Sequence, residues 1–164
     1  MTTKKPKSTA TSPKRNKSST EKIFGTDVMG HGYTGIPNIM MRAQSRLGLN
    51  SAQFNILIQL LSYYMDSERP PYPTKRELRN RINVSDTTLK KHIRDLEQAG
   101  FVRRQQRFTK AGDFGSNIYH LDGLINKLKK LVPDFDRERE EHKEIRNVSE
   151  RPNARRNAAR KAKA

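Results

Sequence analysis

Residues 73–108 read PTKRELRNRINVSDTTLKKHIRDLEQAGFVRRQQRF, and this stretch decides the fold. Thr74 is followed three residues later by Glu77, the spacing of a capping box, which predicts a helix that begins just after Thr74. Asn83 then favours a tight turn, and Ser85 is a good N-cap for a second helix. Two short helices joined by such a turn predict a helix-turn-helix.

The second helix is predicted to be amphipathic. Its apolar side is formed by Leu89, Ile93 and Leu96, at spacings of four and three residues, and Gly100 is typical of a helix C-terminus. A DNA-recognition helix buries one side on its own domain and leaves its N-terminal outer side free for the major groove. On that outer side we expect short polar groups near the tip and basic groups behind them. These residues are Asp86, Thr87, Thr88, Lys90, Lys91 and Arg94.

A β-hairpin is predicted directly after this helix. Residues 101–108 mix apolar and basic side chains as a strand does, residues 109–115 have the composition of a turn, and residues 116–121 predict a returning strand. The residues of the returning strand expected to pack are Ile118, Tyr119 and Leu121. A hairpin in this position is a wing, whose basic residues near the DNA backbone or the minor groove would be Arg103, Arg104, Arg107 and Lys110. The predicted fold class is therefore mainly α with a small β-hairpin (α+β), a winged helix-turn-helix.

Two more helices are predicted before the quoted stretch. Pro37 suits the first turn of one helix, which ends at Gly48. The other is capped by Asn50 or Ser51 and runs through Asp66. Its apolar stripe is formed by Phe54, Leu57, Ile58, Leu61 and Met65. A stripe of this kind is expected to supply core.

One further helix is predicted after the wing, beginning at Asp122 or Gly123. Pro133 is expected to interrupt it, and Phe135 to anchor a charged continuation. The apolar residues before Pro133 either close the core or form a contact between two copies of the chain. We favour the core, because the domain is short of apolar residues.

The two ends of the chain are strongly basic. Residues 1–22 hold seven basic side chains and one acidic one, and residues 147–164 hold six and one. Both ends lack the large apolar groups that a core needs and are predicted to be disordered. The glycine-rich residues 23–35 are predicted to form a loop. The predicted organisation is a basic tail at 1–22, the winged domain at 23–132, a charged helical extension at 133–147 and a second basic tail at 148–164.

The composition restricts the partner. The chain has 164 residues and a formal charge of +17, which favours a polyanion such as nucleic acid. It has no cysteine, His31 has no second ligand at metal spacing, and no recognisable catalytic motif is present, so we expect no cofactor, no metal and no enzymatic activity. No apolar run is long enough to span a bilayer and no secretion signal follows the basic N-terminus. We expect a cytoplasmic, nucleoid-associated protein that does not bind membranes.

Residues 84–102, VSDTTLKKHIRDLEQAGFV, resemble the winged helix-turn-helix domains of bacterial regulators and of plasmid or phage replication proteins. The likeness extends over residues 37–131. The positions that it implies to face DNA are Ser85, Asp86, Thr87, Lys90 and Lys91. Asp86 departs from the pattern, since such domains often carry Arg there. It either accepts a hydrogen bond from a cytosine amino group or acts as a helix cap.

We therefore predict binding of double-stranded DNA, by a monomer or a homodimer. Transcription regulation is the favoured role, and initiation or support of plasmid or phage replication is the alternative. An RNA-binding basic protein is disfavoured, because Phe101, Phe108 and Tyr119 are better explained by the wing and the core than as stacking platforms. The predicted DNA-binding residues are Thr74, Lys75, Arg76, Ser85, Asp86, Thr87, Thr88, Lys90, Lys91, Arg94, Arg103, Arg104, Arg107 and Lys110.

Overall fold

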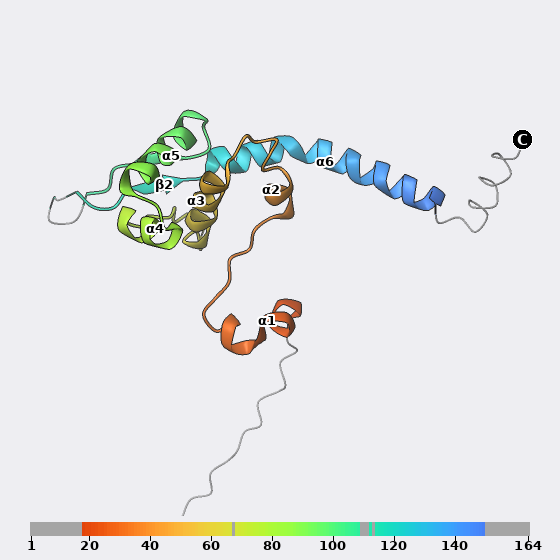
Figure 1. Ribbon diagram of the computed structural model, residues 1–164, viewed down its shortest axis with the longest axis horizontal. Coiled ribbons are helices and arrows are strands. Elements are labelled where there is room, and N and C mark those ends of the chain that lie inside the picture. The colour runs from red at the N-terminus through yellow and green to blue at the C-terminus, as the bar shows by residue number, and fades with distance from the viewer. Residues whose placement is uncertain (1–17, 67, 109–111, 113, 150–164) are drawn as a thin grey trace, which may run out of the picture. The chain divides into compact units, whose positions relative to one another are not determined.

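The computed structural model describes residues 18–66, 68–108, 112 and 114–149. The chain forms two compact units, Met1–Thr34 and Gly35–Ala164, which are described separately (Figure 1). The predictions made for residues 1–17 and 150–164 lie outside the described residues.

The first unit contains the helix α1 (Ser19–Met29). Ser18 caps it, because its side chain accepts a hydrogen bond from the backbone N–H of Glu21 at 3.1 Å. The helix bends at Gly25, whose φ of 82° is readily adopted only by glycine. The sequence predicts a tail and then a loop here, and both predictions are wrong for α1. A good N-cap and the absence of proline permit helix here, and Gly25, whose backbone is not helical, divides α1 into two short pieces.

The second unit begins with two helices, α2 (Asn38–Arg42) and α3 (Ser51–Ser62). α2 is shorter than predicted, because the chain continues in turns as far as Gly48, which has a φ of 67°. Of the two predicted caps of α3, Asn50 is the one that forms. It makes a capping box with Gln53, through hydrogen bonds of 2.9 and 3.1 Å.

The end of α3 differs from the prediction. The helix stops at Ser62, because the chain turns at Tyr63 and the backbone of Asp66 then pairs with that of Arg69. Met65 follows this turn and is 89% exposed, so its predicted place in the apolar stripe is wrong.

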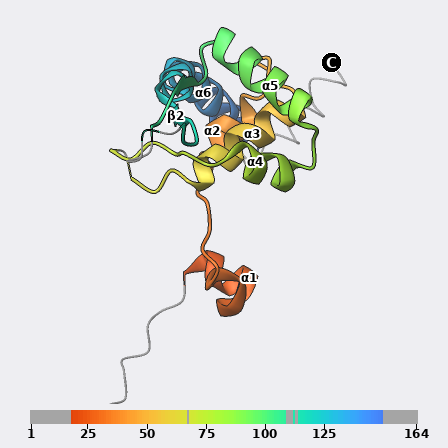
Figure 2. The same cartoon turned by 90° about the vertical axis from the view of Figure 1, so that its left-hand side faces the viewer.

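The helix-turn-helix is formed by α4 (Lys75–Ile82) and α5 (Asp86–Gln98), as predicted. Between them, Asn83 adopts a left-handed conformation with a φ of 57°, which asparagine tolerates better than most residues. Both helices contact α3, and Figure 2 shows the three helices packed beside one another. The buried residues of α4 and α5 are Leu78, Leu89, Ile93 and Leu96. The apolar periodicity therefore identified the buried side of α5 correctly.

The wing is an antiparallel hairpin of β1 (Arg103–Gln105) and β2 (Ile118–His120), in which Arg104 lies opposite Tyr119. Its regular strands are shorter than predicted. Tyr119 is fully buried and Leu121 is 2% exposed, whereas Ile118 is only half-buried. Alternate residues of a strand share a face, which places Tyr119 and Leu121 together in the core.

The last helix, α6 (Asp122–Ser149), is continuous, so the predicted interruption at Pro133 is wrong (Figure 1). Proline removes one backbone hydrogen bond and strains a helix interior. Contacts on both sides of Pro133 offset this, since Leu124 is buried before it and Phe135 after it. The anchoring role predicted for Phe135 is confirmed.

A single core cluster connects the helices and the wing of the second unit. Its residues are Met40, Leu49, Ile56, Leu57, Leu60, Leu78, Leu89, Ile93, Leu96, Phe101, Val102, Tyr119, Leu121 and Leu124. Leu124 and Leu128 of α6 pack in or against this cluster, so the preference for the core is confirmed at these two positions. One side of α5 packs in this core, and so do the residues at the base of the wing.

The capping box of α4 provides a first testable prediction. The carboxylate of Glu77 accepts hydrogen bonds from the N–H and the hydroxyl of Thr74, each at 2.8 Å, and these bonds lower the pKa of Glu77. We expect Thr74→Ala to reduce the free energy of unfolding by about 1 kcal/mol at neutral pH. A carboxyl with a lowered folded-state pKa stabilises the fold above its ordinary pKa, and this contribution is lost as the pH falls through the lowered value. Urea unfolding at several pH values should show the difference from the wild type shrinking in acid, and a pH-independent difference would contradict the assignment.

Candidate nucleic-acid interface

The side of α5 opposite the core is exposed and basic. Residues three or four apart share one face of a helix, and this face is formed by Thr87, Lys91, Arg94 and Gln98, all exposed. Among the residues that the structure describes, no carboxylate lies within ion-pair distance of Lys91 or Arg94. We call these four residues the outer face of α5. Its two cations are available to an external anion.

Lys90 lies on a neighbouring flank of α5 and is paired within the helix. Its Nζ atom is 2.5 Å from Oδ2 of Asp86, one turn earlier. The hydrogen bond from Lys90 is the main reason why the pKa of Asp86 is lowered, and Lys75 and Arg79 add electrostatically to this effect. The cap itself is Ser85, so Asp86 occupies the first turn and holds Lys90.

Three predicted contact residues have clear local roles. The hydroxyl oxygen of Ser85 accepts a hydrogen bond from the backbone N–H of Thr88 at 3.1 Å and lies 2.8 Å from the hydroxyl of Thr88. Thr74 forms the capping box of α4. These residues fix where the two helices begin, and through this they position the exposed side chains that follow. A role of the same residues in DNA contact stays a prediction.

The wing arginines occupy different environments. The guanidinium of Arg104 bonds the carboxylate of Glu97, and its backbone N–H donates to the same carboxylate at 3.2 Å, so Arg104 ties the wing to α5. Glu97 also raises the pKa of Arg104. Arg103 is exposed and points to the opposite side of β1, because side chains alternate along a strand. Arg107 lies with its guanidinium 4.7 Å from the ring centre of Tyr72. Lys110 lies outside the described residues.

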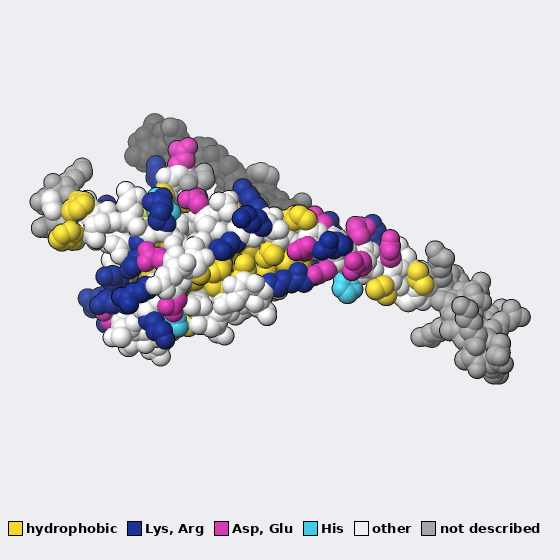
Figure 3. Space-filling view, turned by 90° about the horizontal axis from the view of Figure 1, so that it is seen from above, with side chains coloured by type: hydrophobic (Ala, Val, Ile, Leu, Met, Phe, Trp, Pro, Cys, Tyr) yellow, Lys and Arg dark blue, Asp and Glu magenta, His cyan; other side chains and the backbone are white. Residues whose placement is uncertain are grey.

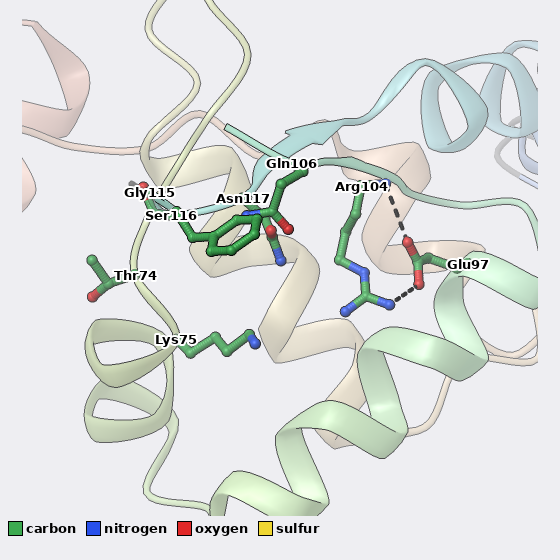
Figure 4. Close-up of a pocket in the computed structure, with 9 residues that line it drawn as sticks. Thr74, Lys75, Glu97, Arg104, Gln106, Gly115, Ser116 and Asn117 are labelled. Atoms are coloured by element: carbon green, nitrogen blue, oxygen red, sulfur yellow. Dashed lines mark hydrogen bonds and ion pairs between the residues drawn. The ribbon is translucent and has the colours of Figure 1, made fainter. Parts of the chain in front are cut away.

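A hollow of about 910 Å³ lies between α4, α5 and the wing. Figure 4 shows Lys75 reaching into it from the first turn of α4 and Arg104 from the wing. Its lining is completed by Thr74, Glu97, Gln106, Phe114, Gly115, Ser116 and Asn117. Lys75 also acts electrostatically on Asp86, so the hollow lies beside the start of α5. The hollow therefore adjoins both α5 and the wing, and two cations reach it.

Several residues of this surface are not in the predicted set. Gln106, Ser116 and Asn117 line the hollow, and their place depends on the pairing of the wing strands, which the sequence leaves open. Arg79 follows Lys75 by one helical turn, and its charge helps to lower the pKa of Asp86. The helical spacing from Lys75 could have identified Arg79 as a residue of this surface. Arg76 is exposed on α4.

The basic side chains of the second unit are concentrated at the end that carries the helix-turn-helix, which is also where the hollow lies. Figure 3 shows Lys and Arg side chains gathered at the end that carries the helix-turn-helix, whereas acidic and basic side chains alternate along the far part of α6. The cations of α6 there are paired locally, as Arg137 with Asp134 and Arg139 with Asp136. An extended polyanion would meet uncompensated charge at the helix-turn-helix.

The described residues contain no group of three or more His, Cys, Asp or Glu side chains that could hold a metal ion. Over the same residues, no helix combines the length and the apolar character needed to cross a bilayer.

A sequence model of the DnaD N-terminal domain matches residues 36–141. The chain belongs to this family. The match covers α2 to α5, the wing and most of α6, which are the elements that build the outer face of α5 and the hollow. No curated protein is similar enough to the chain to count as a relative.

Three solved structures are similar to the chain to different degrees. The N-terminal domain of DnaD from Geobacillus kaustophilus HTA426 is 21% identical, with a TM-score of 0.52, over 74% of this chain and 96% of that one. A possible transcriptional regulator from Methanosarcina mazei Go1 is 19% identical, with a TM-score of 0.42, over 65% and 85% of the two chains. MarR is 16% identical, with a TM-score of 0.37, over 89% and 93%. The first of these supports the winged-helix fold of the second unit.

Proposed function

We propose that this protein binds double-stranded DNA in a sequence-specific manner, with α5 in the major groove and the wing on the flanking backbone. The observation that carries the proposal is the outer face of α5, whose cations Lys91 and Arg94 are exposed and without an acidic partner among the described residues. The opposite side of the same helix is fully buried. The helix is thus held rigidly with its polar side presented outward, as a recognition helix requires.

The residues divide into base contacts and phosphate contacts. Thr87 and Lys91 are placed to reach base edges, and Arg94 the backbone. Lys75 and Arg79 on α4 lie near the start of α5 and meet phosphates there. Arg76, exposed on α4, and Arg107 on the wing add further phosphate contacts. These phosphate contacts supply affinity that falls with salt and carries little sequence information.

Lys91→Ala and Lys90→Ala form a matched pair of variants. From sequence the two lysines have the same role, but Lys90 is paired with Asp86 and Lys91 has no such partner among the described residues. We expect Lys91→Ala to weaken binding to a preferred duplex by about 1–3 kcal/mol and to relax sequence preference, and Lys90→Ala to do so less. The measurement is a fluorescence-anisotropy titration with the preferred duplex and a scrambled one. Equal losses for both variants, or a larger loss for Lys90→Ala, would reject the proposed orientation of α5.

The preferred duplex comes from a selection experiment. The full chain is incubated with random genomic duplex fragments, and the retained pool is sequenced at two salt concentrations. The proposal expects an enriched motif that survives the higher salt, and a symmetric motif would indicate a homodimer. A pool without a motif, held only at low salt, would reject sequence-specific binding.

For the biological role, we propose support of DNA replication, acting by binding rather than catalysis, in the cytoplasm on the nucleoid. Membership of the DnaD N-terminal domain family, which is related to replication, supports this role. Enriched sites that cluster at replication origins would agree with it. Sites that cluster at promoters, with altered transcription of the adjacent genes, would instead establish the transcription regulator.

A further inference from the structure

The wing region exposes three aromatic rings that the duplex-binding surface does not need. Tyr72 is 55% exposed, Phe108 61% and Phe114 78%. From sequence, Phe108 is grouped with Phe101 and Tyr119 as residues of wing and core. Phe101 and Tyr119 are indeed buried, at 5% and 0% exposure, but Phe108 is not part of the core. Phe108 therefore belongs to the wing, where most of its ring faces solvent.

The rings are held in place rather than loosely attached. Phe108 follows β1 and Phe114 precedes β2, and an isolated antiparallel bridge pairs their backbones, with ring centres 5.5 Å apart and planes at 40°. Tyr72 is fixed to the wing from the other side, because its carbonyl oxygen accepts a hydrogen bond from the hydroxyl of Ser116 at 2.9 Å. Mutual contact accounts for the closeness of the two phenylalanines but leaves most of each ring in solvent.

The positive charge around these rings indicates an anionic partner. Arg107 lies against Tyr72, and Phe114 lines the same hollow as Lys75 and Arg104. Among the described residues that line this hollow, Glu97 is the one carboxylate, and it is paired with Arg104. Figure 3 shows apolar side chains exposed at the wing end of the second unit, beside the basic group. A second copy of the chain docked here would bring like charges together, whereas a nucleic-acid strand supplies both phosphates for the cations and flat bases for the rings.

We propose that the wing binds unpaired DNA bases, with Phe114 as the principal stacking ring, supported by Phe108, and with the cations of the hollow on the adjoining phosphates. Aromatic rings in basic grooves stack on bases without sequence preference, and apolar wedges at protein–DNA interfaces unstack base steps. The inference rests on the proposed duplex binding by α5. If both surfaces bind DNA together, the preferred DNA structure is a junction between duplex and single strand. The duplex then lies on α5 and the first unpaired bases lie on the wing.

The test compares a forked DNA with a blunt duplex of the same paired sequence, using the full chain. 2-Aminopurine occupies the first unpaired position of the fork, and its fluorescence reports stacking. We expect the wild type to bind the fork more tightly than the duplex by about 5- to 150-fold, the range of one stacked base, and to quench 2-aminopurine. Phe114→Ala should remove both the preference for the fork and the quenching.

Two further variants separate the possible explanations. Phe114→Leu keeps an apolar side chain but no ring face, and should behave like Phe114→Ala if stacking is the cause. Lys91→Ala should weaken binding to fork and duplex alike and leave their ratio unchanged, so failure of duplex binding and failure of stacking are distinguishable.

Several results would overturn the inference. These are equal affinity of the wild type for fork and duplex, unquenched 2-aminopurine in the complex, or a fork preference that survives in Phe114→Leu. Tighter binding to single-stranded RNA than to DNA of the same sequence would assign the rings to RNA. A drop from dimer to monomer mass in Phe114→Ala would assign them to contact between copies of the chain.

Discussion

Replacing Gly123 by alanine is expected to lower the free energy of unfolding by about 3 kcal/mol or more, the upper range for overpacking a well-packed site. A Cβ atom on Gly123 would overlap the carbonyl oxygen of Gly100 and lie 3.2 Å from that of Phe101. These are backbone atoms, so no side-chain rotation can make room. The start of α6 cannot shift easily either, since the N–H of Leu124 donates to the carbonyl of Phe101 at 3.0 Å and Leu124 is buried. The same contact holds the junction between α5 and the wing.

Gly35→Ala is the matched control for this substitution. An alanine Cβ at Gly35 meets no atom within 4 Å, and the φ of Gly35 is not in the left-handed range. Urea unfolding should therefore show a midpoint near that of the wild type for Gly35→Ala and a much lower one for Gly123→Ala. Similar midpoints for the two variants would mean that α6 does not dock on the α5–β1 junction as described.

Reversing both cations of the outer face, in the double variant Lys91→Glu/Arg94→Glu, is expected to weaken binding to the preferred duplex by about 30-fold or more. Each contact is expected to contribute about 1–3 kcal/mol, and the introduced carboxylates repel the phosphates. Both residues are exposed on α5, so the fold should be unaffected. Affinity is measured by titration at fixed salt, and circular dichroism checks the helix content.

The double variant Arg137→Glu/Arg139→Glu changes the net charge by the same amount at the far part of α6. These arginines are 69% and 72% exposed and take part only in i,i+3 pairs on the surface, which contribute little to stability. We expect a much smaller loss of affinity, due to the change of overall field alone. Equal losses in the two double variants would show that binding follows net charge rather than the outer face of α5.

The helix-turn-helix could be predicted from the sequence because its determinants are local. The capping residues Thr74 and Ser85, the turn at Asn83 and the spacing of the apolar residues all act within a few positions of one another. The same rules place Lys91 and Arg94 on the outer side of α5.

The structure departs from the sequence-based prediction where contacts between distant residues, or a competing local interaction, determine the position of a side chain or the course of the backbone. Pro133 remains inside α6 because Phe135 packs beneath Arg42 and Arg46, whose guanidiniums lie 4.8 and 4.6 Å from its ring centre. The pairing of Arg104 with Glu97 depends on how the wing folds back on α5, which no sequence spacing shows. The pairing of Lys90 with Asp86 is a local signal that competes with the assignment of both residues to DNA.

The most direct test of the central claim is a two-dimensional amide spectrum of the full chain with and without the preferred duplex. We expect the largest changes at the outer face of α5, at Thr87, Lys91, Arg94 and Gln98, with further changes at Lys75 and the wing. The far part of α6 should be unaffected. Changes confined to the basic residues of the two chain ends, with α5 unperturbed, would contradict recognition by the winged helix and leave only nonspecific attraction to the phosphate backbone.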